Sequence, residues 1–152
     1  MPLRIALWNA TDHQAKKHEV EVFLNLNSVG ILLVAETHYT TRTHIKIPHY
    51  IIHHTEHPDN TAHGGAAIII KDTLIHHELP QYQENYLQAA VIQVNKLPSP
   101  LTLAAVYCPP RHNLTKDMLM MFFDSLGQTF IVQRKTYKLG FKARNYERQR
   151  IK

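Results

Sequence analysis

The chain has 152 residues, of which 44% are hydrophobic, so it is long enough and apolar enough to fold as one domain. Its single cysteine, Cys108, excludes an internal disulfide framework, and no apolar run approaches the roughly 20 residues that cross a bilayer. The formal net charge is +5, but residues 133–152 hold eight of the 17 Lys and Arg residues and one of the 12 acidic residues. The N-terminal apolar stretch is too short for a signal peptide, so we expect an intracellular protein, nuclear or cytoplasmic, with no membrane partner.

The first quarter of the chain predicts a strand, a helix and a second strand. Residues 3–9 alternate in polarity with the period of two that is typical of a strand. Residues 11–14 have the spacing of a capping box, apolar residues follow at helical spacing, and Gly30 is suited to end that helix. Residues 31–35 are all apolar, which predicts a strand covered on both faces.

The rest of the chain reads mainly as strands, with one further helix. In chain order we expect a short strand (50–52), a loop (53–64), an apolar strand (66–70), a hairpin (87–94 with 101–106), a helix and a strand from 130. The helix would be capped by Thr115 and end at Gly127, and its core face would hold Leu119, Phe122, Phe123 and Leu126. Consecutive antiparallel strands predict an α/β protein with a core of two sheets. Apolar periodicity ends at Val132, so we divide the chain into a domain, 1–132, and a basic tail without regular structure, 133–152.

One carboxylate, Glu36, directly follows the apolar strand 31–35 and is therefore expected at the lip of the sheet. An ionised carboxylate in that place needs a cation, a metal ion or several hydrogen-bond donors. On position alone, a helix N-cap or a surface glutamate that simply follows a strand is the more common explanation.

Four segments in a fixed order resemble one known family. They are Trp8-Asn9, Ala35-Glu36-Thr37-His38, Gly64-Gly65-Ala66-Ala67-Ile68-Ile69-Ile70 and Ala104-Ala105-Val106-Tyr107-Cys108-Pro109-Pro110. Together they resemble the N-terminal part of the endonuclease/exonuclease/phosphatase superfamily, and within it the apurinic-endonuclease-like domain of jockey-type non-LTR retrotransposons. The resemblance covers roughly residues 3–132 and implies a partial DNase I-like fold, a four-layer α/β sandwich whose C-terminal half is missing.

The resemblance also implies a chemistry, the metal-assisted hydrolysis of a phosphodiester in DNA that nicks a target site for retrotransposition. The cofactor would be Mg²⁺ or Mn²⁺, held by Glu36, because such ions combine one or two carboxylates with water and phosphate oxygens. Asn9 would orient Glu36, a metal-bound water or the phosphate, and the Tyr107 hydroxyl would donate to the scissile phosphate. His38 could approach a phosphate, although a surface histidine is as plausible at that position.

Two further motifs of the family, Gly-Asp-x-Asn and Ser-Asp-His, do not occur in this sequence. The first supplies a water-orienting carboxylate and a phosphate-binding amide, and the second supplies a histidine for the phosphate. We therefore expect a catalytically incomplete derivative of a DNA endonuclease. We also expect an exposed apolar sheet face that favours self-association, because much of the family's second sheet would be absent.

Two other functions remain open on the residues alone. The tail interleaves its cations with Tyr137, Phe141 and Tyr146, a composition that can pair with phosphates and stack on bases in a non-enzymatic nucleic-acid-binding protein. The chain also has 12 histidines, and a His53/His57 pair could bind Zn²⁺ if that segment were helical. Nearby proline, asparagine and glycine residues argue against a helix there.

Overall fold

A computed structural model describes residues 2–10, 16–42, 45–95, 97–127, 129–134 and 142–144. Its elements in chain order are β1 (Ile5–Asn9), α1 (Lys17–Leu26), β2 (Ile31–Ala35), β3 (Tyr50–Thr55), β4 (Ala66–Lys71), β5 (His76–Glu78), β6 (Tyr82–Glu84), β7 (Leu87–Val94), β8 (Leu101–Tyr107), α2 (Lys116–Ser125), β9 (Phe130–Arg134) and β10 (Lys142–Arg144). Both helices are ten residues long, and neither could cross a membrane.

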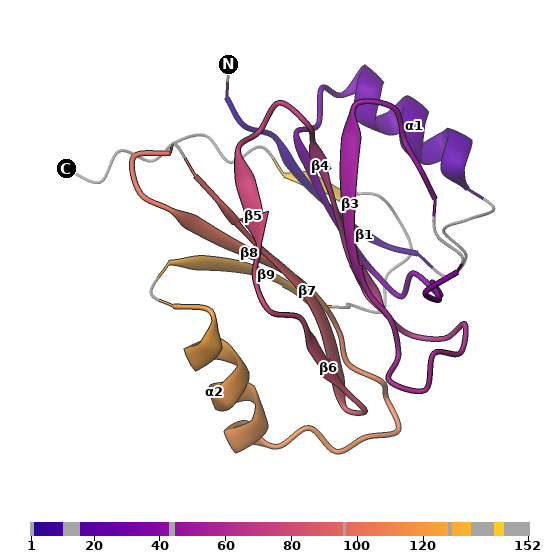
Figure 1. The fold of residues 1–152 in the computed structure, drawn as a ribbon, viewed down its shortest axis with the longest axis vertical. Coiled ribbons are helices and arrows are strands. Elements are labelled where there is room, and N and C mark those ends of the chain that lie inside the picture. The colour runs from indigo at the N-terminus through magenta and orange to yellow at the C-terminus, as the bar shows by residue number, and fades with distance from the viewer. Residues whose placement is uncertain are drawn as a thin grey trace.

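The strands form two sheets that pack face to face (Figure 1). The first sheet has the order β10-β1-β2-β4-β3, with β1 and β2 parallel and the other pairs antiparallel. The second has the order β5-β7-β8-β9, with β6 also paired to β7 and with β8 and β9 parallel. Helix α1 covers the outer face of the first sheet and α2 that of the second, so the expected four-layer α/β sandwich is confirmed.

The central strand β2 is buried along its whole length because both of its faces are covered. Ile31 and Leu33 pack between the sheets, against apolar residues of β7 and β8 such as Ile92 and Leu103. Leu32 and Val34 point the other way, into the cluster beneath α1. This alternation is what a two-residue side-chain period produces in a strand with an apolar layer on each side.

Helix α2 begins and ends where the sequence predicts. The Thr115 hydroxyl accepts a hydrogen bond from the backbone N–H of Met118 at 3.2 Å, which satisfies one of the unpaired amides of the first turn. Phe122 and Leu126 are buried against the second sheet. Gly127, with φ +82°, follows the last turn in the left-handed conformation that glycine adopts readily. The capping box predicted for α1, residues 11–14, lies outside the described residues.

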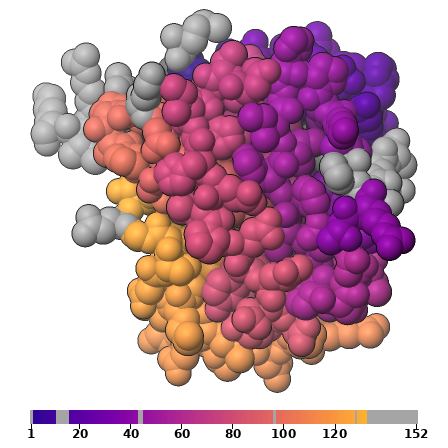
Figure 2. All heavy atoms as spheres, in the orientation of Figure 1, coloured from indigo at the N-terminus to yellow at the C-terminus, as the bar shows by residue number. Residues whose placement is uncertain are grey.

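Several predicted boundaries were wrong. The loop expected over 53–64 starts later, because β3 continues to Thr55 by pairing with β4. The three-residue strands β5 and β6 carry too little pattern to predict, and Figure 2 shows their segment on the surface between the first sheet and α2. The predicted tail, 133–152, contributes the end of β9 and the whole of β10, which pairs with β1. The remainder of that tail lies outside the described residues.

The inner face is covered to a greater extent than the sequence suggested. Most residues of β1, β2, β4, β7 and β8 that face the other sheet are buried, with at most 4% exposed, while Leu7 and Leu101 are partly buried. Ile131 of the edge strand β9 is only partly buried. The large apolar residues that are exposed lie elsewhere, for example Leu26 at the end of α1 and Met121 on α2. Self-association therefore stays a prediction.

Two histidines bridge edge strands of the two sheets. The Nε2 atoms of His53 on β3 and His76 on β5 lie 2.8 Å apart. His76 Nδ1 bonds the carbonyl of Leu74 at 2.7 Å, so in a neutral His76 ring Nε2 is the acceptor and His53 Nε2–H is the donor. Burial lowers the pKa of His53, opposed by the carboxylate of Glu78 and reinforced by His76.

A glycine pair, the Gly64–Gly65 turn, precedes β4, and both residues have positive φ, +64° and +80°. A Cβ at Gly65 would lie 2.9 Å from the backbone carbonyl oxygen of Thr55 and 2.9 Å from the hydroxyl of Thr37. Those distances are too short for carbon, and a carbonyl in a strand cannot move aside cheaply. The turn therefore requires glycine for space as well as for conformation.

Gly65→Ala should consequently destabilise the fold more than Gly127→Ala. Both positions have φ near +80°, but a Cβ at Gly127 would meet no described atom within 4 Å. Gly127→Ala should cost only the left-handed strain of about 1–2 kcal/mol, while Gly65→Ala adds an overpacking term of about 1–3 kcal/mol. Urea unfolding of both variants measures the difference, and equal losses would contradict the packing described for the turn.

The buried His53 should make stability depend on pH. Because folding lowers its pKa below 6.5, the unfolded chain takes up a proton first as the pH falls. The free energy of unfolding should therefore decrease from about pH 7.5 to about pH 5, and His53→Gln should reduce that decrease. Urea unfolding at both pH values tests this, with the exposed His112→Gln as the control. An unchanged pH dependence in His53→Gln would contradict the prediction.

Candidate active site

Three of the predicted site residues lie at the carboxyl ends of strands. Asn9 is the last residue of β1, Glu36 directly follows β2, and Tyr107 is the last residue of β8. The parallel pairing of β1 and β2 sets Asn9 opposite Ala35, and the N–H of Ala10 donates to the Ala35 carbonyl at 2.9 Å. The Asn9 and Glu36 positions are thereby neighbours at the carboxyl ends of β1 and β2 in the first sheet.

The backbone after β2 is held by the Gly64–Gly65 turn. The N–H of Glu36 donates to the Gly65 carbonyl at 2.8 Å, and the N–H of His38 donates to the Gly64 carbonyl at 2.9 Å. Glu36 and His38 both have positive φ, +63° and +57°, which is uncommon outside glycine and costs about 1–2 kcal/mol per residue. Strained backbone of this kind concentrates at functional sites, where surrounding contacts hold it in place.

The same turn brings in Tyr107 from the second sheet. A Cβ at Gly64 would lie 2.9 Å from Tyr107 Cε1 and 2.9 Å from Gln88 Oε1, so the turn packs directly on both side chains. Gln88 is the cross-strand partner of Tyr107, and its Oε1 accepts from the N–H of Gly65 at 3.4 Å. One side of the turn thus supports Glu36 and the other contacts the Tyr107 ring.

Polar atoms beside Glu36 are buried without hydrogen-bond partners. Among the described residues, Asn9 Oδ1, Thr37 Oγ1 and His38 Nε2 are each shielded from solvent and form no hydrogen bond. His38 Nε2 lies 3.9 Å from Glu36 Oε1, too far for a hydrogen bond and close enough for ionic attraction. Buried polar groups are normally satisfied, so these unbonded atoms, on residues that lie next to Glu36 in the chain or on the paired strand end, indicate a place for an ion, a water molecule or a ligand oxygen. The oxygen donors fit a hard divalent cation such as Mg²⁺ or Mn²⁺.

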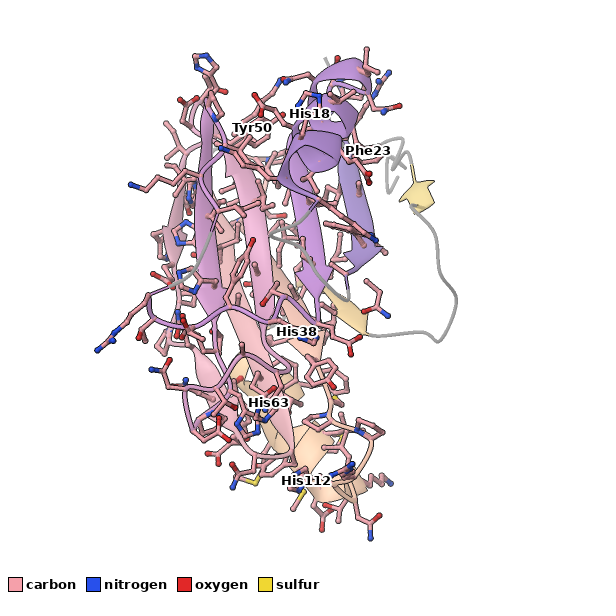
Figure 3. All side chains as sticks on the ribbon, turned by 90° about the vertical axis from the view of Figure 1, so that its right-hand side faces the viewer. His18, Phe23, His38, Tyr50, His63 and His112 are labelled. Carbon is pink, nitrogen blue, oxygen red and sulfur yellow. The ribbon has the colours of Figure 1, made fainter. Side chains whose placement is uncertain are left out.

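Figure 3 shows His38 at the strand ends, with His63 and His112 toward the same end of the molecule, whereas His18, Phe23 and Tyr50 lie at the opposite end. Two residues of this site were not predicted, Thr37 and Gln88. Gln88 did carry a signal, because it is the only strongly polar residue in the otherwise apolar stretch 87–92 and is completely buried.

The His53/His57 pair considered for zinc is not formed. His53 bonds His76, while His57 lies in the following loop with its Nδ1 2.8 Å from Asp59 Oδ1. A backbone hydrogen bond from Thr61 lowers the pKa of Asp59 to about 2, helped by hydrogen bonds from the Thr61 hydroxyl and from His57. The segment is not helical, as the sequence indicated.

Comparison with known sequences finds relatives among mobile elements. The chain is 34% identical over 129 residues to an RNA-directed DNA polymerase from mobile element jockey of Drosophila melanogaster. It is 35% identical over 133 residues to a probable RNA-directed DNA polymerase from transposon X-element of the same species. These alignments cover 85% and 87% of this chain but only 14% and 15% of the relatives, so the chain spans about a seventh of their length. No family model matches.

Solved structures share the fold. The endonuclease domain of TRAS1, a telomere-specific non-LTR retrotransposon, superposes with a TM-score of 0.67 at 18% identity and matches 88% of this chain and 60% of its own. The Xenopus laevis APE2 catalytic domain superposes with a TM-score of 0.61 at 15% identity and matches 90% and 59%. These similarities show that the chain has the fold of the TRAS1 endonuclease domain, and with the sequence relatives they confirm its resemblance to the apurinic-endonuclease-like domains of jockey-type non-LTR retrotransposons.

Proposed function

We propose that this chain carries the metal-binding and phosphate-binding half of a DNA endonuclease site, and that these 152 residues alone hydrolyse DNA poorly. The observation that supports the proposal is the group of buried, unbonded polar atoms around Glu36, on strand ends held together by the Gly64–Gly65 turn. A site for a small ligand accounts for atoms that would otherwise be costly to bury.

The residues suit distinct tasks at a phosphodiester. Glu36 would hold Mg²⁺ or Mn²⁺, which when bound stabilises negative charge on the phosphate and the leaving oxygen. The Asn9 amide would orient the Glu36 carboxylate or a water molecule, because it can both donate and accept. The Tyr107 hydroxyl would donate to a phosphate oxygen, and the side chain of His38, which is one-third exposed, would contact the phosphate from the solvent side.

A DNA strand is the substrate that best fits the family. TRAS1 contributes an endonuclease domain of a retrotransposon, and the sequence relatives are proteins of mobile elements that encode an RNA-directed DNA polymerase. An element of that kind needs an opened DNA strand at its target, and a nicking endonuclease supplies it. By this relationship we assign the nicking chemistry to the Glu36 site.

We infer that these residues do not by themselves complete a hydrolytic site. Within the described ranges, Glu36 and His38 are not joined by a third His, Cys, Asp or Glu side chain close enough to share an ion with them. The sequence also contains neither Gly-Asp-x-Asn nor Ser-Asp-His. Without a group to orient the attacking water, about 10²–10⁴-fold of rate is lost, and the missing phosphate contacts lower it further.

Nicking of supercoiled plasmid in the presence of Mg²⁺ should therefore be slow. We expect the 152-residue chain to be at least about 10²-fold slower than the TRAS1 endonuclease domain assayed in parallel. Gel separation of supercoiled and nicked plasmid measures both rates. A rate within about tenfold of TRAS1 that is abolished by Glu36→Gln would overturn the proposed inactivity while supporting the role of Glu36.

Metal binding at Glu36 should be detectable without activity. Mn²⁺ added to labelled protein should broaden the amide signals of residues near Asn9, Glu36 and His38, because a paramagnetic ion relaxes nearby nuclei. Glu36→Gln should remove that broadening, whereas Glu19→Gln on the exposed surface of α1 should leave it unchanged. Broadening that persists in Glu36→Gln would place the ion elsewhere and contradict the assignment.

A further inference from the structure

A loop next to the candidate active site gathers a second set of ligand atoms. In the segment that we call the 57–63 loop, His57, Asp59 and His63 each offer one ligand atom, and these three atoms lie within 4.8 Å of one another. We infer that this loop binds a divalent transition-metal ion of the Zn²⁺ class. The inference rests on other residues than the proposed endonuclease function and does not depend on it.

The spacing of the atoms is close to that of a metal site. Two ligands bonded to tetrahedral Zn²⁺ at about 2.0–2.1 Å lie roughly 3.3 Å apart. Here His57 Nδ1 lies 2.8 Å from Asp59 Oδ1, and His63 Nε2 lies 3.7 Å from Asp59 Oδ2. The rings of His57 and His63 have centroids 3.9 Å apart. Shifts of these ligand atoms by a fraction of an ångström, through side-chain rotation, are enough to admit the ion.

Hydrogen bonds already orient His63 for coordination. The Thr61 hydroxyl donates to Asp59 Oδ1 at 2.8 Å, so its oxygen is left to accept from His63 Nδ1, with which it is in hydrogen-bond contact. A neutral His63 that donates through Nδ1 has its lone pair on Nε2, the atom that faces Asp59. Anchoring one ring nitrogen so that the other can bind a metal is the usual arrangement of histidine ligands.

His57 would bind the ion through Nδ1 with its ring proton on Nε2, and the ion would replace the long 3.4 Å hydrogen bond that Nδ1 accepts from the Asp59 backbone N–H. Nδ1 also faces Asp59 Oδ1, and the ion would lie between these two atoms. The side chain of His57 is 11% exposed, while those of Asp59 and His63 are about half exposed. One partly buried ligand and two exposed ones leave an entry path and an open coordination position for water.

The donor set selects the class of metal. Two imidazoles and one carboxylate suit Zn²⁺ and its neighbours in the transition series, whereas Mg²⁺ prefers oxygen ligands and keeps several waters. The oxygen-rich surroundings of Glu36 and the nitrogen-rich 57–63 loop should therefore attract different ions from the same solution.

The loop is connected at two points to residues 36–41, which follow β2 and begin with Glu36. The Asn60 side chain accepts from the N–H of Thr41 at 3.1 Å and donates to the Thr41 hydroxyl at 3.2 Å. At its other end, His63 immediately precedes Gly64, whose carbonyl accepts from the N–H of His38. An ion that joins His57 to His63 would restrain the stretch between these two attachments.

Isothermal titration of the full chain with Zn²⁺, with Mg²⁺ in excess, tests the inference. We expect one tight site that is lost in the double variant His57→Ala, His63→Ala. In His63→Ala the affinity should fall by more than roughly 100-fold, because losing a ligand should cost more than the 10–100-fold loss that follows removal of an outer-shell partner. His18→Ala is the matched control, because this exposed histidine lies at the opposite end of the molecule (Figure 3). Glu36→Gln should leave Zn²⁺ binding unchanged, which separates this site from the endonuclease site.

A second measurement locates the ion. Zn²⁺ should slow hydrogen exchange of the amides between His57 and Gly64, and this protection should disappear in His63→Ala, which alters an exposed side chain and should fold normally. Co²⁺ in place of Zn²⁺ should give the visible bands of a tetrahedral site without the thiolate band that ligation by Cys108 would add. Equal losses of affinity in His18→Ala and His63→Ala, or a thiolate band, would overturn the inference.

Discussion

The arrangement of the site depends on the contact between the Gly64–Gly65 turn and its two neighbours. The turn's carbonyls accept the amides of Glu36 and His38, and its Cα atoms pack against Thr37 on one side and Tyr107 on the other. A side chain at either glycine would push these groups apart. Residues distant in the sequence, from two different sheets, are therefore held together mainly by backbone that carries no side chain of its own.

Strand pairing explains why the turn lies where it is needed. The antiparallel register of β2 with β4 sets Ala35 opposite Ala66, so the end of β2 meets the start of β4. The parallel register of β1 with β2 brings Asn9 to that same end. In a strand buried on both faces, a slip of one residue would exchange all inward and outward side chains, so the core that stabilises β2 also specifies the position of Glu36.

Much of this fold could be predicted from the sequence. The rest could not, and the causes are physical. Apolar runs with buried faces predicted the strands 31–35 and 66–70, and Thr115 predicted the start of α2, because burial and capping are local in sequence. The extension of β3 through His53 and His54 arises from pairing with β4, which no local pattern of histidines encodes. The same holds for β5, β6 and β10, which are too short to have a period.

The candidate site likewise has a part that the sequence predicts and a part that depends on tertiary contacts. Strand ends predicted the positions of Asn9, Glu36 and Tyr107, but the support from Gln88 and the unbonded hydroxyl of Thr37 depend on tertiary contacts. The histidines show this most clearly, since one residue type occupies three environments: His53 bridges two sheets, His57 contacts a carboxylate in a loop, and His38 lies beside Glu36. Neighbouring groups decide which of these rings is shared between the sheets, which faces the Asp59 carboxylate and which lies beside Glu36. The number of histidines in the segment therefore indicates nothing by itself, and the donor atoms around each ring determine its chemistry.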